Sequence, residues 1–330
     1  MAFALADRWV WDFWLAREQG RYHLFFLEAP KSIGDPDARH WNVSIGHAVS
    51  PDLADWTSLG TCFRPAPGPA WDDGTTWTGS VIRHGGKWWM FYTGTSKGES
   101  LRKQRIGLAT SDDLHDWRRF EKNPILDLDP RHYEEYDPTA WHDRSLRDPW
   151  VAPDPEGKGF RMWFTARARG GAADGRGTIG TARSADLVTW VAEPPLTPPG
   201  DFGECEVPQY FAVDGRHYLL FSTSAQRTSA VRRAALEKSN EPAETGTHYF
   251  MAESPHGPWR LGPAPFLAGD ALGSLYAGRV AVDAKGRLVF LGFIGERPGR
   301  GFVGAISDPI PVAVGADGRL RLQVKAGASP

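Results

Sequence analysis

Three acidic residues, Asp12, Asp148 and Glu206, stand at similar places in three hairpin patterns of the sequence. Each lies eight or nine residues before a glycine that suits a tight turn, close to apolar and aromatic residues. A carboxylate can serve as a nucleophile, a general acid or a general base, but such chemistry needs several groups to converge on one substrate. These three side chains can therefore act together only in a fold that brings them to one place.

A repeated pattern along the chain indicates how that fold is built. It occupies residues 45–56, 106–117 and 179–190, with a weaker copy at 249–259 and a decayed copy at 303–309. Each strong copy predicts a short strand, a polar Ser-x-Asp turn and a tryptophan that enters the next strand. Internal repeats of this kind are typical of propellers, whereas a β-sandwich would not repeat such a signature.

A second hairpin alternates with the first and has a Gly-Lys or Gly-Arg turn. Its turn glycines are Gly20, Gly86, Gly157, Gly215 and Gly286. The two hairpins together make a four-stranded unit that occurs five times, which is the sequence form of a propeller blade. We therefore expect an all-β fold, a five-bladed β-propeller with four antiparallel strands per blade and an active site in its central funnel. Because the repeat covers the chain, residues 1–330 are expected to form one domain, with residues 318–324 closing the ring.

Equivalent positions in a radial array lie at equal distances from its axis. If the strands before the turn glycines are the innermost ones, the three carboxylates point into one funnel. The same count places Trp77 in the second unit and Ala277 in the fifth at the equivalent position. Glu204 shares a strand face with Glu206, because residues two apart point the same way, but the spacing and the following Val207-Pro208 favour Glu206.

Other residues near these positions could bind a substrate. Arg147 adjoins Asp148, Ser80 lies near Trp77, and Tyr276 is expected to reach the funnel. Tryptophans expected to face the funnel, where they could stack on a sugar, are Trp11, Trp14, Trp41, Trp77 and Trp150. The insertion at residues 225–246 predicts a short exposed helix or a loop at the rim.

The composition excludes several other classes of function. The chain has 38 Lys and Arg against 40 Asp and Glu, a balance that argues against nucleic-acid binding. No apolar run is long enough to span a bilayer, and the first residues lack the basic region of a signal peptide, so we expect a cytoplasmic location. The two cysteines and ten histidines show no ligand spacing. We expect no cofactor, and no local acidic loop indicates a metal site. The sequence does not predict whether a structural calcium is bound or what the oligomeric state is.

The motifs resemble those of glycoside hydrolase families 32 and 68, which are five-bladed propellers that act on fructans and sucrose. The residues that carry the likeness to family 32 are Tyr22–Phe25, Gly46–Leu53, Trp77–Ser80, Arg147–Pro149 and Tyr276-Ala277, whereas Trp11–Trp14 is more similar to the nucleophile motif of family 68. The resemblance covers nearly the whole chain, with the motifs in the correct order. It is closest to a family 32 catalytic domain without the C-terminal β-sandwich, although the Asn-Asp-Pro-Asn-Gly form of the nucleophile motif is missing.

The resemblance implies a role for each charged residue. Asp12 would be the nucleophile, Glu206 the general acid/base and Asp148 the transition-state stabiliser, with Arg147 binding substrate hydroxyls. The implied reaction is retaining hydrolysis of β-fructofuranosyl linkages in sucrose, fructo-oligosaccharides or fructans, with transfer to another sugar as a competing outcome. The implied partner is a small carbohydrate, and the chemistry needs no cofactor.

Two alternatives remain open at this point. One is an inverting enzyme like family 43, acting on arabinofuranosides or xylosides, in which the two catalytic carboxylates stand about 6.5–9.5 Å apart. The Arg147-Asp148-Pro149 sequence argues against it. The other is a propeller that binds carbohydrate without catalysis, and the presence of all three carboxylates argues against that, because binding alone needs no charged triad.

Overall fold

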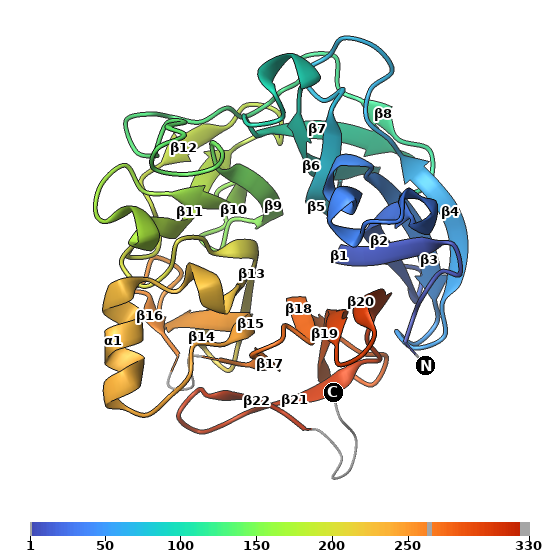
Figure 1. Ribbon diagram of the computed structural model, residues 1–330. Helices are drawn as coiled ribbons and strands as arrows, with labels where there is room; N and C mark the ends of the chain where they lie inside the picture. Colours follow the sequence, from blue (N-terminus) through green and yellow to red (C-terminus); the bar gives the residue numbers. More distant parts are fainter. Residues whose placement is uncertain (1, 263–265, 324–330) are drawn as a thin grey trace.

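The computed structural model describes residues 2–262 and 266–323. Five antiparallel sheets are arranged radially around a central axis, and the innermost strands β1, β5, β9, β13 and β18 surround that axis (Figure 1). Three sheets have four strands and two have a fifth short strand outside the main path. The predicted five-bladed propeller is therefore confirmed.

The blades follow one another along the chain. The first contains β1 (Arg8–Glu18), β2 (Arg21–Pro30), β3 (Ser44–Ser50) and β4 (Thr57–Phe63), and the second contains β5 (Thr75–His84), β6 (Lys87–Thr95), β7 (Arg105–Ser111) and β8 (Arg118–Arg119). The third contains β9 (Leu146–Pro153), β10 (Phe160–Arg167), β11 (Gly177–Ser184) and β12 (Val191–Glu193).

The last two blades carry the extra strands. The fourth contains β13 (Glu206–Val213), β14 (Arg216–Thr223), β15 (Thr245–Ala252) and β16 (Arg260–Leu261), with β17 (Ala268–Asp270) beside β15. The fifth contains β18 (Leu275–Val282), β19 (Leu288–Arg297), β21 (Ile310–Val314) and β22 (Leu320–Leu322), with β20 (Gly301–Ile306) beside β19. Short 3-10 helices lie in the connections at Lys31–Ile33, Pro36–Trp41, Lys97–Glu99, Ala173–Gly175 and Ala225–Arg227.

The second strand of each blade is largely buried, because neighbouring blades cover both of its faces. Every residue of β10 is buried, and six of the ten residues of β19 are buried. Such strands are mainly apolar and do not alternate strictly, although β10 also buries Arg161, Thr165 and Arg167. The apolar clusters lie between blades, so the core is distributed around the ring and holds the inner strands at fixed positions.

The Ser-x-Asp repeat forms the same turn in the first three blades. In the third blade, Ser184 Oγ accepts the N–H groups of Asp186 and Leu187, and the indole N–H of Trp190 donates to the carbonyl of Leu187. The middle leucine has a positive φ in each copy, 67° at Leu187. The serine hydroxyl thus accepts backbone N–H groups that have no strand partner in the turn.

The insertion at residues 225–246 contains the helix α1 (Ala230–Lys238), as predicted. Ser229 caps it by accepting the N–H of Arg232. In the part of the chain that the structure describes, neither α1 nor any other helix has the length and apolar character needed to cross a membrane.

The ring closes differently from the prediction. β22 is the outer strand of the fifth blade and takes no part in the first, and Val324 lies outside the described residues. An antiparallel bridge between Phe3 and Ile306 joins the two ends of the ring, and Tyr22 Oη donates to the carbonyl of Val282. Each blade is therefore a single continuous segment.

Candidate active site

Each innermost strand has a β-bulge at the same level. The register shifts between Trp11 and Phe13 in β1 and between Trp77 and Gly79 in β5. The corresponding shifts in β9, β13 and β18 span Asp148-Pro149, Val207-Pro208 and Ala277-Gly278. A bulge takes a residue out of the ladder and redirects its groups, which is a common device beside active sites.

The bulges define three layers of residues along the axis. The mouth layer holds the residue before each bulge: Trp11, Trp77, Arg147, Glu206 and Tyr276. The middle layer holds the first bulge residue: Asp12, Thr78, Asp148, Val207 and Ala277. The floor layer holds the residue two positions further on: Trp14, Ser80, Trp150, Gln209 and Arg279. Three members of the middle layer have a positive φ: 58° at Asp148, 53° at Val207 and 48° at Ala277.

Two of the predicted equivalences, those of Trp77 and Glu206, were wrong by one residue, whereas Ala277 shares the middle layer with Asp12 and Asp148 as predicted. Trp77 matches Trp11 in the register, and Thr78 is the counterpart of Asp12. Glu206 matches Arg147 instead of Asp148. The error has a physical cause in the turns. In the third blade, the last ladder pair joins Pro153 and Phe160, whereas in the fourth blade the strands turn within two residues. Counting the same number of residues back from the turn glycine therefore reaches different layers in these two blades.

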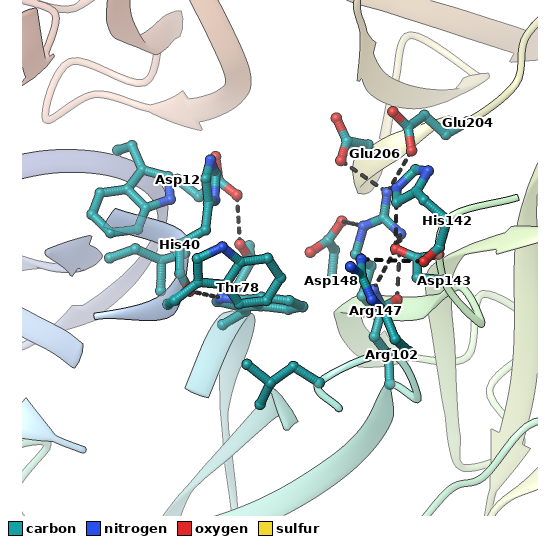
Figure 2. A pocket seen from close by; sticks show the side chains of 16 residues that line it. Asp12, His40, Thr78, Arg102, His142, Asp143, Arg147, Asp148, Glu204 and Glu206 are labelled. Carbon is teal, nitrogen blue, oxygen red and sulfur yellow. Dashed lines mark hydrogen bonds and ion pairs between the residues drawn. The ribbon is translucent and has the colours of Figure 1, made fainter. Parts of the chain in front are cut away.

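The three carboxylates nevertheless line one cavity of about 220 Å³ at the mouth of the funnel. Figure 2 shows Asp12 and Thr78 on one side of it and Asp148, Arg147 and Glu206 on the other. The full lining is Trp11, Asp12, Leu27, His40, Trp41, Trp77, Thr78, Leu101, Arg102, Gln104, His142, Asp143, Arg147, Asp148, Glu204 and Glu206.

The pKa of Asp12 lies close to neutral pH. Its Oδ2 accepts a hydrogen bond of 2.6 Å from Thr78 Oγ1, which links the middle layers of the first two blades. Burial and, after it, the charge of Asp148 raise the pKa of Asp12 to about 7, although the Thr78 hydrogen bond acts in the opposite direction. Around neutral pH this carboxyl can therefore exist with or without its proton.

Asp148 is held rigidly by partners from three blades. Its Oδ2 accepts Thr165 Oγ1 at 2.8 Å and the backbone N–H of Val207 at 3.0 Å. Its own N–H donates to Thr93 Oγ1 at 2.8 Å. The bulge frees the Val207 N–H from the ladder and makes this contact possible. Burial raises the pKa of Asp148, and the charge of Arg147 limits that rise.

Glu206 lies between a cation and a phenol from the two neighbouring blades. Arg147 Nη2 donates to Oε1 at 2.9 Å, and Tyr276 Oη donates to Oε2 at 2.5 Å. All three residues belong to the mouth layer, so the blade-to-blade order of the propeller creates the contact. Both oxygens are fixed without a substrate.

Arg147 is surrounded by carboxylates. Besides Glu206, its guanidinium contacts Glu204 at 2.8 Å, Asp143 at 3.5 Å and Asp148 at 3.7 Å. Burial disfavours its charge, yet these neighbours hold the pKa of Arg147 well above its ordinary value. Through these contacts Arg147 orients the acidic groups. Its contact with substrate hydroxyls remains a prediction.

An aromatic wall covers the side of the cavity next to Asp12. Trp11 is 1% exposed, and Trp77 Nε1 donates to the carbonyl of His40 at 2.9 Å. Trp41 lies at the rim, 46% exposed, with its ring 5.7 Å from that of Trp77. Burial, followed by the charges of Arg39 and Arg147, lowers the pKa of His40 to about 3, so this imidazole is neutral at pH 7.

Two predicted substrate contacts are wrong, because their residues belong to the floor layer. Trp14 is fully buried and stacks on Phe25 at 6.0 Å between ring centroids. Ser80 Oγ accepts the backbone N–H of Val151 at 3.0 Å and joins the second blade to the third. Trp150 lines a different cavity, at the opposite end of the funnel. These residues were expected at the site because they lie close in sequence to Asp12, Trp77 and Asp148, but two positions along a strand also means a different depth.

The sequence interpretation missed several residues of the site. Thr78 was one position away from a predicted contact, and Glu204 had been set aside although it shares Arg147 with Glu206. His40, Arg102, Gln104, His142 and Asp143 come from connecting loops, where no repeat marks them. Within the described ranges, no group of three or more His, Cys, Asp or Glu residues is arranged to hold a metal ion.

Comparison with known proteins adds independent evidence. The family model described as the glycosyl hydrolases family 32 N-terminal domain matches residues 14–300, a range that begins just after Asp12. The raffinose invertase of Escherichia coli is 29% identical over 221 residues, covering 64% of this chain and 41% of that protein. The insoluble β-fructofuranosidase isoenzyme 7 of Oryza sativa subsp. indica is 27% identical over 328 residues, covering 92% and 51% respectively. The chain thus spans about half or less of the length of these relatives.

Solved structures share the fold. An inulosucrase from Halalkalicoccus jeotgali bound to kestose matches with a TM-score of 0.79 at 21% identity, covering 96% of this chain and 87% of that one.

Proposed function

The chain belongs to glycosyl hydrolase family 32, and from this premise we propose that it is a retaining glycoside hydrolase of β-fructofuranosyl linkages. One observation carries the proposal. Asp12, Asp148 and Glu206 come from three different blades and line a single cavity with an aromatic wall. A sugar ring fits such a wall through its apolar face, while the carboxylates act on its anomeric carbon.

Asp12 is the proposed nucleophile. Its ionised carboxylate attacks the anomeric carbon of the fructosyl unit, forming a covalent ester as the bond to the leaving oxygen breaks. The aromatic wall keeps water away from this side of the cavity, so the carboxylate meets the substrate with little hydration to lose. Thr78 fixes the carboxylate through Oδ2 and leaves Oδ1 for the attack.

Glu206 is the proposed general acid and then the general base. It gives its proton to the leaving oxygen, and it later removes a proton from the water or sugar hydroxyl that attacks the ester and releases Asp12. Arg147 fixes Oε1 throughout. The proton belongs on Oε2, where the Tyr276 hydroxyl can rotate to accept a hydrogen bond from it.

Asp148 and its partners support the oxocarbenium-like transition state. Its Oδ2 is already held by Thr165 and Val207, so Oδ1 is the atom proposed to bind ring hydroxyls. A partner held in advance costs no reorganisation at the moment of reaction. The names of the related proteins support sucrose, raffinose-type oligosaccharides and fructans as the substrate class.

The test is fructose release from sucrose, raffinose, inulin-type and levan-type fructans, with an aryl arabinofuranoside in the same panel. The wild type is expected to release fructose, and Glu206→Gln is expected to lower kcat by at least about 1000-fold with substrates that have poor leaving groups. With methanol present, retention predicts methyl β-fructofuranoside as the transfer product. Arabinose release, or a methyl glycoside of inverted configuration, would assign the inverting alternative instead.

A further inference from the structure

The floor layer contains one buried cation, Arg279, in the fifth blade. Its side chain is 1% exposed. Nε donates to the carbonyl of Phe13 at 3.2 Å, and Nη1 donates to the carbonyls of Val207 at 2.9 Å and Pro208 at 2.7 Å. Its guanidinium carbon lies 5.2 Å from the ring centroid of Trp150. One side chain therefore joins the fifth blade to the first, third and fourth blades.

These contacts fall beside the acidic residues of the site. Phe13 directly follows Asp12, and Val207 directly follows Glu206. Trp150 is separated from Asp148 only by Pro149, whose ring restricts the backbone. Arg279 thus bonds or touches the chain within two residues of all three carboxylates, although it does not line their cavity.

A cation in this position is costly for stability. Other buried arginines of the chain have a direct acidic partner, as Arg161 has in Asp154 and Arg167 has in Glu134. Within residues 2–262 and 266–323, no carboxylate lies within ion-pair distance of Arg279, and its Nη2 has no hydrogen-bond acceptor. An unpaired buried charge is unfavourable unless something else compensates for it. Here the nearest negative charges are those of Asp12 and Asp148, one layer above it in the funnel.

We propose that Arg279 is a positioning residue: it tethers the backbone behind Asp12 and Glu206, and its charge favours the ionised form of the nucleophile. The proposal rests on the proposed function of the site. Two further effects agree with it. Burial lowers the pKa of Arg279 to about 10, which leaves the guanidinium charged at pH 7, and its charge counteracts the rise in the pKa of Asp12.

Two variants separate the tether from the charge. Arg279→Lys keeps the charge but lacks the planar fork needed to reach both sets of carbonyls. It is expected to lower kcat about 10-fold or more with KM within a few-fold, because misplaced reacting groups cost rate more than binding. Its pH profile should keep the wild-type acid limb. Arg279→Gln lacks the charge, and it is expected to lower kcat about 100-fold and to shift the acid limb of kcat/KM to higher pH by roughly one unit.

The matched control is Arg161→Gln. Arg161 is also 1% exposed, but it lies in the second strand of the third blade and pairs with Asp154, away from the cavity. Arg161→Gln should lower the free energy of unfolding without shifting the acid limb of kcat/KM. Equal limb shifts in the Arg161 and Arg279 variants, or wild-type kcat in Arg279→Lys, would overturn the proposal.

A second measurement does not depend on activity. Unfolding free energies of the wild type, Asp12→Asn, Arg279→Gln and the double variant form a cycle that reports the coupling between the two residues. The coupling should be favourable at pH 8, where Asp12 is ionised, and should vanish near pH 4. A cycle without pH-dependent coupling contradicts the charge role even if no fructoside is a substrate. Pairwise coupling with an inactive wild type would instead reject the proposed function alone.

Discussion

At the scale of single residues, the site separates three carboxyl groups by their surroundings. Asp12 has one neutral hydrogen-bond donor and raised proton affinity, whereas Asp148 has a backbone N–H and the Arg147 charge beside it. Glu206 receives two donors from side chains of adjacent blades. The same chemical group can take different roles because each blade supplies a different neighbour.

The raised pKa of Asp12 predicts how stability depends on pH. An unfolded aspartate titrates near pH 3.8, whereas the folded value is about 7, so the folded state binds the extra proton between these values. Ionising Asp12 therefore reduces stability progressively as the pH rises from about 4 to 7. Asp12→Asn should be more stable than the wild type by at least about 1 kcal/mol at pH 8, and this difference should disappear at pH 4. Urea unfolding at the two pH values measures it. An unchanged difference would show that burial of the charge is not costly.

The Thr78 hydrogen bond predicts a shift in the activity profile. Thr78→Val keeps the side-chain shape but removes the donor that stabilises the Asp12 carboxylate. The acid limb of kcat/KM, which reports the free enzyme, should move upward by roughly half a unit to one unit. Thr178→Val, which removes a buried hydroxyl of the third blade bonded to Thr197, is the control and should leave the limb in place. An acid limb that stays fixed in both variants would remove Asp12 as its origin.

At the scale of elements, the Ser-x-Asp turns and the β-bulges differ in how far the sequence predicts them. The Ser-x-Asp turn connects the third and fourth strands of a blade and was predictable, because its polar residues recur at one spacing. The bulges were not predictable, because nothing in the local sequence shows that Asp12, Thr78 and Val207 occupy the same structural position. Turn length differs between blades, and only the ladder register shows the level of each side chain. The three carboxylates line one cavity, whereas Trp14 and Ser80, which were expected to contact substrate, lie in the floor layer.

The turn itself can be tested. Ser184→Ala removes the acceptor for two backbone N–H groups, and it is expected to lower the free energy of unfolding by about 1 kcal/mol. Chemical denaturation measures the change. Ser32→Ala, at an exposed position outside the strands, should stay within about 0.5 kcal/mol of the wild type. Equal effects at the two positions would mean that the hydroxyl does not support the turn.

At the scale of the whole molecule, the ring is held by contacts between complete blades. Phe3 and Ile306 exchange two backbone hydrogen bonds of 2.8 Å, and Phe3 packs against Phe26 at 5.2 Å between ring centroids. The repeat predicted the number of blades, but it could not predict this closure. Phe3 lies outside the repeated pattern, and it is more than 300 positions away from its bridge partner Ile306.

Loss of the Phe3 ring should weaken the closure selectively. Phe3→Ala is expected to lower stability by roughly 3 kcal/mol, because a largely buried aromatic ring leaves a cavity. Hydrogen exchange should show the first loss of protection in β1 and β20, on the two sides of the closure. Uniform loss of protection across β10 and β14 would indicate instead that the ring unfolds only as a unit.

The continuous blades also bear on how the protein is made. No sheet waits for a strand from a distant part of the chain, so each blade can form its ladder soon after its four strands leave the ribosome. The contacts between the first and fifth blades, such as those of Phe3, Phe13 and Tyr22, must wait for the last quarter of synthesis. Until then the first blade exposes the apolar flank that the fifth will cover, and this flank is where a nascent chain would need protection from its neighbours.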